Sequence, residues 1–192
     1  MSHPGILCLM PVDREHVLAE AAALLTRRAT TSMDEIARAA GISRATLHRH
    51  FAGRDALIRA LEEHGIERFA RAIDAARLDE GDAAGALRRL VHEAEPVAGV
   101  LAFLFTENQL FENEPVNAGW AQLDARLTAL FRRGQEEGTF RVDLSAIWLT
   151  EAFYGLLGAG AWAVHEGRVA RNDLDHSIAE LLLGGIRRSM EK

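Results

Sequence analysis

The first apolar stripe of the chain begins a few residues after Asp13. Five apolar residues recur there with the spacing of one buried helix face. They are Val17, Leu18, Ala21, Leu24 and Leu25. Because Asp is a favoured residue at a helix N-cap, Asp13 is expected to cap this helix. The pattern predicts a helix that runs to about Arg28.

Two short helical patterns follow, separated by a tight turn. Residues 32–35, Ser-Met-Asp-Glu, have the sequence of a capping box, which starts a short helix. Gly41 stands where a left-handed residue would end that helix. Ser43 is then placed to cap another helix, with Leu47 and Phe51 on its inner face. Two short helices joined by a turn that contains glycine predict a helix-turn-helix.

The rest of the chain continues with helical spacing. The clearest stripe extends from Val116 to Phe131, after an expected loop at residues 112–115. Further helices are predicted over residues 54–77, 82–94 and 97–110, from a cap at Asp143, and from about Asp173 onward. No segment alternates with the period of two that a half-buried strand would show. We therefore predict an all-α fold.

The long helix over residues 54–77 is expected to connect two bodies. We divide the chain into a tail at residues 1–12, a three-helix domain with the helix-turn-helix at residues 13–55, and a larger helical domain at residues 56–192. The tail has a short apolar run but no basic leader and no small-residue cleavage site, so it does not resemble a signal peptide. Cys8 is the only cysteine, which excludes an intrachain disulfide and a cysteine-based zinc site.

Charge is distributed unevenly along the 192 residues. The formal net charge is −6, but residues 1–55 carry +1 and residues 56–192 carry −7. Residues 26–54 alone carry six Arg against two acidic residues, a local charge of +4. A basic patch on an acidic protein is typical of a small nucleic-acid-binding module joined to another domain.

The second helix of the helix-turn-helix has an outer face suited to DNA. Ala45 and Arg49 lie opposite the inward residues; Arg49 suits a guanine edge, and the Ala45 methyl suits a thymine methyl. Phosphate contacts are expected from a set of polar residues around this face. They are Ser43, Thr46, His48, His50 and Arg54, while Arg44 can contact either base or phosphate. For any one of these residues the alternative is an ordinary solvated side chain.

Residues 31–58, TSMDEIARAAGISRATLHRHFAGRDALI, resemble the N-terminal DNA-binding domain of TetR-family transcriptional regulators. The similarity covers about a sixth of the chain. The family usually has Tyr at the position of His48 and often Lys at that of Arg54. The resemblance implies a C-terminal domain that binds a small-molecule effector and forms a homodimer through the last two long helices. It also implies a repressor that binds an inverted-repeat operator in double-stranded DNA and releases it when the effector binds.

The penultimate predicted helix carries an independent signal for close packing. Gly155 and Gly158 are unfavourable within an apolar helix unless another helix approaches closely. We therefore expect a homodimer interface that includes Gly155, Gly158 and Leu182, with packing inside one chain as the alternative. Residues 144–164 are also long and apolar enough to span a bilayer, which leaves a membrane-anchored protein as a further alternative.

The middle helices hold candidates for an effector pocket. We expect six residues to line it: Phe69, Phe105, Asn108, Trp120, Leu123 and Phe153. Ordinary core packing is the alternative for each of them except Asn108. No Lys or Arg occurs between Arg89 and Arg126, so the expected ligand is mostly apolar and neutral or cationic.

The sequence does not support an enzyme, and we expect no cofactor and no metal site. Residues 158–163 match a dinucleotide-binding fingerprint, but no strand precedes them as that motif requires. His92-Glu93 and His165-Glu166 lack the second histidine of a zinc motif. The predicted protein is a soluble, cytoplasmic, ligand-responsive DNA-binding regulator. The alternative is a helical small-molecule-binding protein that does not regulate DNA.

Overall fold

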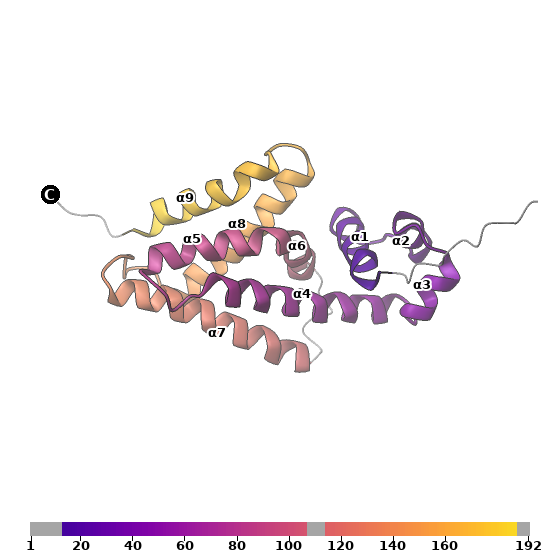
Figure 1. Cartoon of the computed structure of the whole chain (residues 1–192), viewed down its shortest axis with the longest axis horizontal. Coiled ribbons are helices and arrows are strands. Elements are labelled where there is room, and N and C mark those ends of the chain that lie inside the picture. The colour runs from indigo at the N-terminus through magenta and orange to yellow at the C-terminus, as the bar shows by residue number, and fades with distance from the viewer. Residues whose placement is uncertain (1–12, 107–113, 188–192) are drawn as a thin grey trace, which may run out of the picture.

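The computed structural model describes residues 13–106 and 114–187. This part of the chain is helical, and its only extended pairing is an isolated bridge between Phe140 and Arg187. The all-α prediction is confirmed. Helices α1 to α3 form a small first body, helices α5 to α9 form a larger second body, and α4 extends along both (Figure 1).

The first body begins with the helices that the sequence predicts. They are α1 (Arg14–Arg27), α2 (Met33–Ala39) and α3 (Arg44–His50). The Asp13 side chain accepts a hydrogen bond from the Glu15 amide, and Ser32 and Ser43 cap the next two helices. Local capping chemistry therefore places all three helix starts correctly.

Helix α4 (Arg54–Ala76) belongs to both bodies. Its first two turns contribute Leu57, Ile58 and Leu61 to the core of the first body, whereas Phe69 and Ile73 belong to the second core. The first core thus extends past the boundary expected at residue 55, because that boundary falls inside a continuous helix.

The second body contains the remaining helices. They are α5 (Ala83–Ala94), a 3-10 turn (Glu95–Val97), α6 (Ala98–Thr106), α7 (Glu114–Glu136), α8 (Ala146–His165), a second 3-10 turn (Arg171–Asp173) and α9 (Leu174–Ile186). Helix α7 begins at Glu114, whereas the sequence predicted a loop over residues 112–115. The last two residues of the expected loop therefore belong to the helix. The cap of α8 is Ser145, which accepts from the Trp148 amide at 3.1 Å. Asp143, the expected cap, is instead paired with Arg141.

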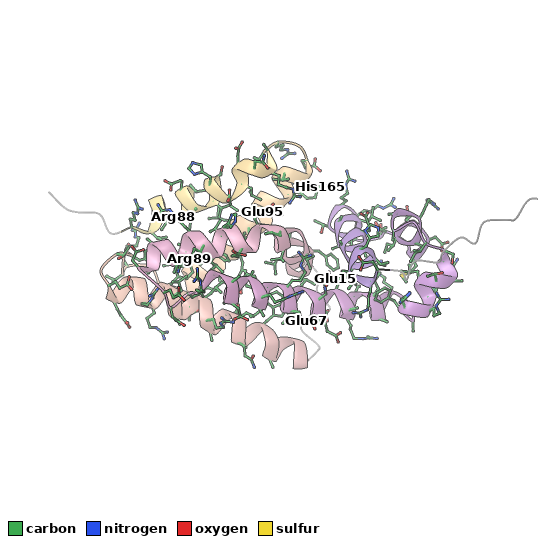
Figure 2. All side chains as sticks on the ribbon, in the orientation of Figure 1. Glu15, Glu67, Arg88, Arg89, Glu95 and His165 are labelled. Atoms are coloured by element: carbon green, nitrogen blue, oxygen red, sulfur yellow. The ribbon has the colours of Figure 1, made fainter. Side chains whose placement is uncertain are left out.

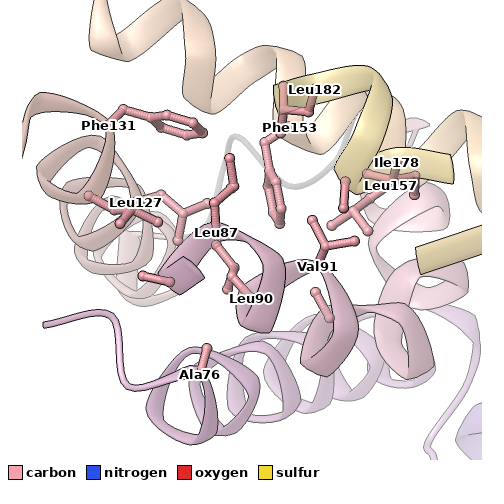
Figure 3. Close-up of a cluster of buried hydrophobic side chains, with 14 of the residues drawn as sticks. Ala76, Leu87, Leu90, Val91, Leu127, Phe131, Phe153, Leu157, Ile178 and Leu182 are labelled. Carbon is pink, nitrogen blue, oxygen red and sulfur yellow. The ribbon is translucent and has the colours of Figure 1, made fainter. Parts of the chain in front are cut away.

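The second core is built from aromatic and aliphatic side chains of α4, α5, α7, α8 and α9 (Figure 3). Phe131, Phe153 and Leu157 are fully buried there. Helix α6 contributes Leu101 to this core but Phe103 and Leu104 to the core of the first body. The two bodies are therefore joined by packing of α6 as well as by the continuous helix α4.

We expect Gly134→Ala to destabilise the fold, because a Cβ at this position would lie 2.1 Å from a ring carbon of the buried Phe140. Overpacking of this kind costs about 1–3 kcal/mol of unfolding free energy. Gly99→Ala, in a helix position with open space around the Cβ, is the control and should be neutral or stabilising by up to about 1 kcal/mol. Urea unfolding of both variants measures the difference, and equal midpoints would contradict the prediction.

Candidate DNA-binding surface and effector groove

The turn between α2 and α3 fixes the angle of the helix-turn-helix. Gly41 has φ +67°, a left-handed conformation that glycine adopts without strain. The Ile42 amide then donates to the Ala37 carbonyl at 2.9 Å, which closes the end of α2. Ser43 starts α3 directly afterwards, because its Oγ accepts from the Thr46 amide at 3.0 Å. The predicted helix-turn-helix is thus present, with α3 at the end of the molecule farthest from α9 (Figure 1).

The start of α2 is held by the predicted capping box. The Ser32 amide donates to the Glu35 carboxylate at 2.8 Å, and the Glu35 amide donates to Ser32 Oγ at 3.3 Å. Arg28 also contacts this carboxylate. The hydrogen bonds from Ser32, and then the one from Arg28, lower the pKa of Glu35 to about 2. Glu35 therefore stays ionised over the whole physiological range and keeps α2 attached to the end of α1.

Helix α3 presents its polar face to solvent. Leu47 is fully buried, while Arg44, Ala45, His48, Arg49 and His50 are exposed and Thr46 is half-buried. Among the residues that the structure describes, Arg49 and His48 have no hydrogen bond or ion pair. The face predicted for base contacts is therefore available for a ligand.

Arg44 is exposed but engaged within the helix-turn-helix. Its guanidinium pairs with the Asp34 carboxylate on α2, with Nε 3.1 Å from Oδ1. An exposed ion pair of this kind contributes about 0–1 kcal/mol, so a phosphate can displace Asp34 at little cost.

Arg54 has a different position from the one expected of a phosphate contact. Its Nη1 donates to the Thr31 carbonyl at 2.8 Å, and its Nη2 donates to the Ala29 carbonyl. Both carbonyls belong to the loop between α1 and α2, so Arg54 connects the start of α4 to that loop. The structure gives Arg54 a positioning role inside the protein.

We expect Arg54→Ala to lower the free energy of unfolding by about 1–3 kcal/mol, because it leaves two loop carbonyls without a charged donor. Arg59→Ala, on an exposed position of the same helix, is the matched control and should change stability by less than about 0.5 kcal/mol. Thermal or urea unfolding provides the measurement. If the two variants unfold alike, the contacts of Arg54 do not stabilise the first body.

A cavity of about 490 Å³ opens between α1, α6 and α8, and we call it the effector groove. Its lining residues are Thr26, Ala102, Glu151, Tyr154, Gly155, Gly158 and Trp162. The wall combines aromatic rings, small residues and one carboxylate, that of Glu151. Such a groove suits a flat apolar molecule, and the carboxylate favours a positive charge on it.

Tyr154 joins the effector groove to an aromatic cluster in the core. Its ring centroid lies 5.6 Å from that of Phe69, 5.9 Å from that of Phe153 and 6.4 Å from that of Trp120. Its hydroxyl donates to Asp124 Oδ1 at 2.8 Å. Burial raises the pKa of Asp124, an effect that this hydrogen bond partly offsets. Burial also raises the pKa of Tyr154, so the hydroxyl remains protonated and continues to donate.

Four of the six residues predicted to line a pocket are not among the residues that line this groove. Phe69, Phe153 and Leu123 are buried core residues, and Trp120 is half-buried beside Tyr154. Asn108 lies outside the described residues, and Phe105 is described only as part of the α6 backbone. Glu151, Tyr154 and Trp162 line the groove but are not among the residues predicted from the sequence. Tyr154 is the only tyrosine of the chain and lies in an apolar run, a signal that would have singled it out.

The expected dimer residues also need correction. Leu182 is 4% exposed and lies in the core of its own chain (Figure 3), so its side chain is not available to a partner. Its neighbour Leu181 is 64% exposed. A Cβ on Gly158 would lie 3.9 Å from Ala102, which places Gly158 at the contact between α8 and α6, whereas Gly155 has open space beside it.

Comparisons with known proteins agree with this geometry. Residues 17–61 match the family model described as "Bacterial regulatory proteins, tetR family". The HTH-type transcriptional regulator NfxB of Pseudomonas aeruginosa is 34% identical over 181 residues, which cover 93% of this chain and 96% of NfxB. The HTH-type transcriptional repressor LfrR of Mycolicibacterium smegmatis is 28% identical over 173 residues, 90% of this chain and 89% of LfrR.

A solved structure supports the same assignment. The crystal structure of the TetR-like transcriptional regulator LfrR from Mycobacterium smegmatis in complex with proflavine has a TM-score of 0.73 to this chain. The two are 26% identical, and the match covers 92% of this chain and 97% of the other.

The fold and the exposed reading helix define a helix-turn-helix DNA-binding protein. Together with the similarity to NfxB over nearly the whole chain, they show that this protein belongs to the TetR family of transcriptional regulators. It is a DNA-binding regulator of transcription.

Proposed function

We propose that the protein is a homodimeric repressor that reads an inverted-repeat operator with α3 and releases it when a flat, apolar cation enters the effector groove. The DNA-binding part of this proposal rests on the exposed face of α3, where Arg49 has no hydrogen bond or ion pair among the described residues. The observation that carries the effector half is a groove whose aromatic wall adjoins the carboxylate of Glu151.

On this proposal, some residues at α3 contact DNA bases and others contact phosphates. Arg49 reads a guanine edge and Ala45 contacts a thymine methyl, because both project from the outer face of α3. Ser43, Thr46, His48 and His50 contact phosphates at the rim, and Arg44 joins them after leaving Asp34. Arg54 acts indirectly, by holding the loop between α1 and α2.

We expect Arg49→Ala to relax the base preference at one position of each half-site, with a loss of discrimination of about 1–3 kcal/mol. His50→Ala is the matched comparison, because loss of a phosphate contact weakens binding to all sequences about equally. Selection of bound sequences from a random DNA pool at two salt concentrations measures both effects. An unchanged set of selected sequences for Arg49→Ala would assign base reading to another residue.

The proposed dimer forms through the exposed apolar faces of α8 and α9. Ile147, Trp148 and Leu181 are 59–64% exposed although large and apolar. A second copy of the chain would cover this surface, as expected for a two-fold homodimer. Helix α8 is also, among the described residues, the one helix long and apolar enough to cross a membrane. Its packing against α6, α7 and α9 supports a dimer interface rather than a membrane span.

We expect Leu181→Glu to convert the dimer to monomer in sedimentation velocity, because it places a charge in a desolvated apolar contact. Ala75→Glu, on an exposed position of α4, is the control and should leave the dimer intact. The monomer should also lose operator affinity, since it carries one reading helix instead of two. A Leu181→Glu protein that sediments as the wild type would remove α9 from the interface.

The proposed effector class follows from the lining of the effector groove. LfrR, with which the chain shares its fold, has been crystallised with proflavine, a flat aromatic cation, and the groove of this chain offers rings and a carboxylate. Trp162 and Tyr154 would stack against such a ligand, and Glu151 would attract its charge.

We expect proflavine to bind the protein and Glu151→Gln to weaken binding by about two- to fivefold, as for loss of a solvent-exposed charge pair. Glu136→Gln, an exposed carboxylate on α7, serves as the control. Proflavine fluorescence provides the titration, and 9-anthracenecarboxylate provides a flat aromatic anion for comparison. Equal affinity for the anion, or no effect of Glu151→Gln, would place the effector elsewhere.

The proposal also includes one negative property and a location. The protein regulates transcription without catalysing a reaction, and it acts in the cytoplasm. Membership in a family of soluble DNA-binding regulators supports both statements.

A further inference from the structure

A second cavity, of about 270 Å³, lies between the first body and the second, and we call it the junction cavity. Helix α1 provides one wall through Ala19, Ala22 and Ala23, and α6 and α8 provide the opposite wall through Gly99 and Ala161. Thr26 lines both this cavity and the effector groove. Its hydroxyl donates to the Ala22 carbonyl at 2.8 Å and lies 3.5 Å from the Gly99 carbonyl, so Thr26 links α1 to α6 where the two cavities meet.

The charges of the junction cavity do not balance. Four of its lining residues carry ionisable groups: Arg68, Glu95, His165 and Arg171. Glu95 accepts a hydrogen bond from Arg171 at 2.7 Å, and this ion pair neutralises both residues. Arg68 has no ion pair among the residues that the structure describes. The cavity therefore contains a half-buried guanidinium without a compensating carboxylate.

The charge of Arg68 also acts on a neighbouring residue. The pKa of the buried His64 lies below its ordinary value, first because of burial and then because of the positive charge of Arg68. Glu15 and Glu67 oppose this lowering, but only in part. The positive charge of Arg68 therefore acts on this part of α4 together with the charges of Glu15, Glu67 and Arg71.

His165 provides a second polar group at the junction cavity. Figure 2 shows it at the end of α8 that faces α1, with Glu95 where α5 passes into α6. Its Nε2 is buried and has no hydrogen-bond partner in the described part of the chain. Since buried polar atoms are normally partnered, an acceptor bound in the cavity would supply, after rotation of the ring, the partner that Nε2 lacks.

We propose that the junction cavity is a second ligand site, separate from the effector groove, which takes a small monocarboxylate with a short apolar tail. The carboxylate would pair with Arg68 and reach His165. The tail would contact the alanine side chains of α1 and the small residues of α6 and α8. The volume of about 270 Å³ limits the ligand to a molecule smaller than those that typical drug-sized pockets accept.

A ligand in this cavity would touch both bodies at once. It would therefore stabilise the arrangement of α1 against α6 and α8 that the structure shows, by the free energy of its own binding. The DNA-reading helices are attached to α1, so occupancy of the junction cavity would restrict their movement relative to the second body.

Calorimetric titration of the full-length protein with hexanoate tests the proposal. Hexanamide, which has the same tail without the charge, and inorganic phosphate, which has charge without a tail, are the comparison probes. We expect hexanoate to bind at least tenfold more tightly than either, because a hydrogen-bonded ion pair and apolar contact both contribute. Hydrogen exchange should also show that hexanoate protects the amides of residues 19–26.

Two variants test whether hexanoate binds in the junction cavity. Arg68→Gln should weaken hexanoate binding by at least tenfold, whereas Arg71→Gln, an exposed residue one turn further along α4, should leave it unchanged. Gly99→Leu retains every charge and adds a bulky side chain to a residue that lines the cavity, where nothing lies within 4 Å of an added Cβ, so it should also weaken binding by at least tenfold. Circular dichroism confirms that each variant is folded.

The proposal is overturned if hexanoate does not bind, if phosphate or hexanamide binds equally well, or if Arg68→Gln or Gly99→Leu leaves the affinity unchanged. None of these measurements uses DNA or proflavine. A negative result for hexanoate would therefore not contradict the proposed function. A failure to select an operator would likewise not contradict the proposed ligand site in the junction cavity.

Discussion

The arrangement of the whole molecule depends on helix α6, which is packed into two hydrophobic cores. Val100, Phe103 and Leu104 belong to the core of the first body, and Ala98 and Leu101 belong to the core of the second. Close packing at this point requires Gly65 on α4, because a Cβ there would lie 2.5 Å from Leu104 Cδ1. A helix shared in this way cannot shift relative to one core without disturbing the other, since protein interiors are close-packed.

This sharing explains how a ligand site and a DNA-reading helix can communicate without a flexible linker. The effector groove and the junction cavity meet at the contact between Thr26 and Gly99, where α1 contacts α6. A molecule that enters either cavity changes the environment of that contact. Because α1 packs directly against α2 and α2 against α3, the two proposed ligand sites are connected to α3 through packed elements alone.

The parts of the fold set by local chemistry could be predicted from the sequence, and the parts set by tertiary packing could not. Ser32, Ser43 and Gly41 act through hydrogen bonds and backbone conformations within a few residues, so the helix-turn-helix was predictable in detail. Leu181 and Leu182 are adjacent and identical in type. Only the packing of α9 on the second core determines which of the two is buried. The position of the Tyr154 ring likewise depends on contacts with Phe69 and Trp120, which are distant in sequence and could not be predicted from local patterns.

The local charge of +4 overstates the number of cations that are available to DNA. Arg28 contacts Glu35 and Arg54 donates to loop carbonyls, so two of the six arginines between residues 26 and 54 hold the first body together, and Arg44 reaches a phosphate only by leaving Asp34. Arg49 is the arginine on α3 that has no such engagement in the described structure. The same residue type therefore performs two tasks in this domain. Substitutions at the engaged positions should affect folding and DNA binding together, whereas substitution of Arg49 separates the two.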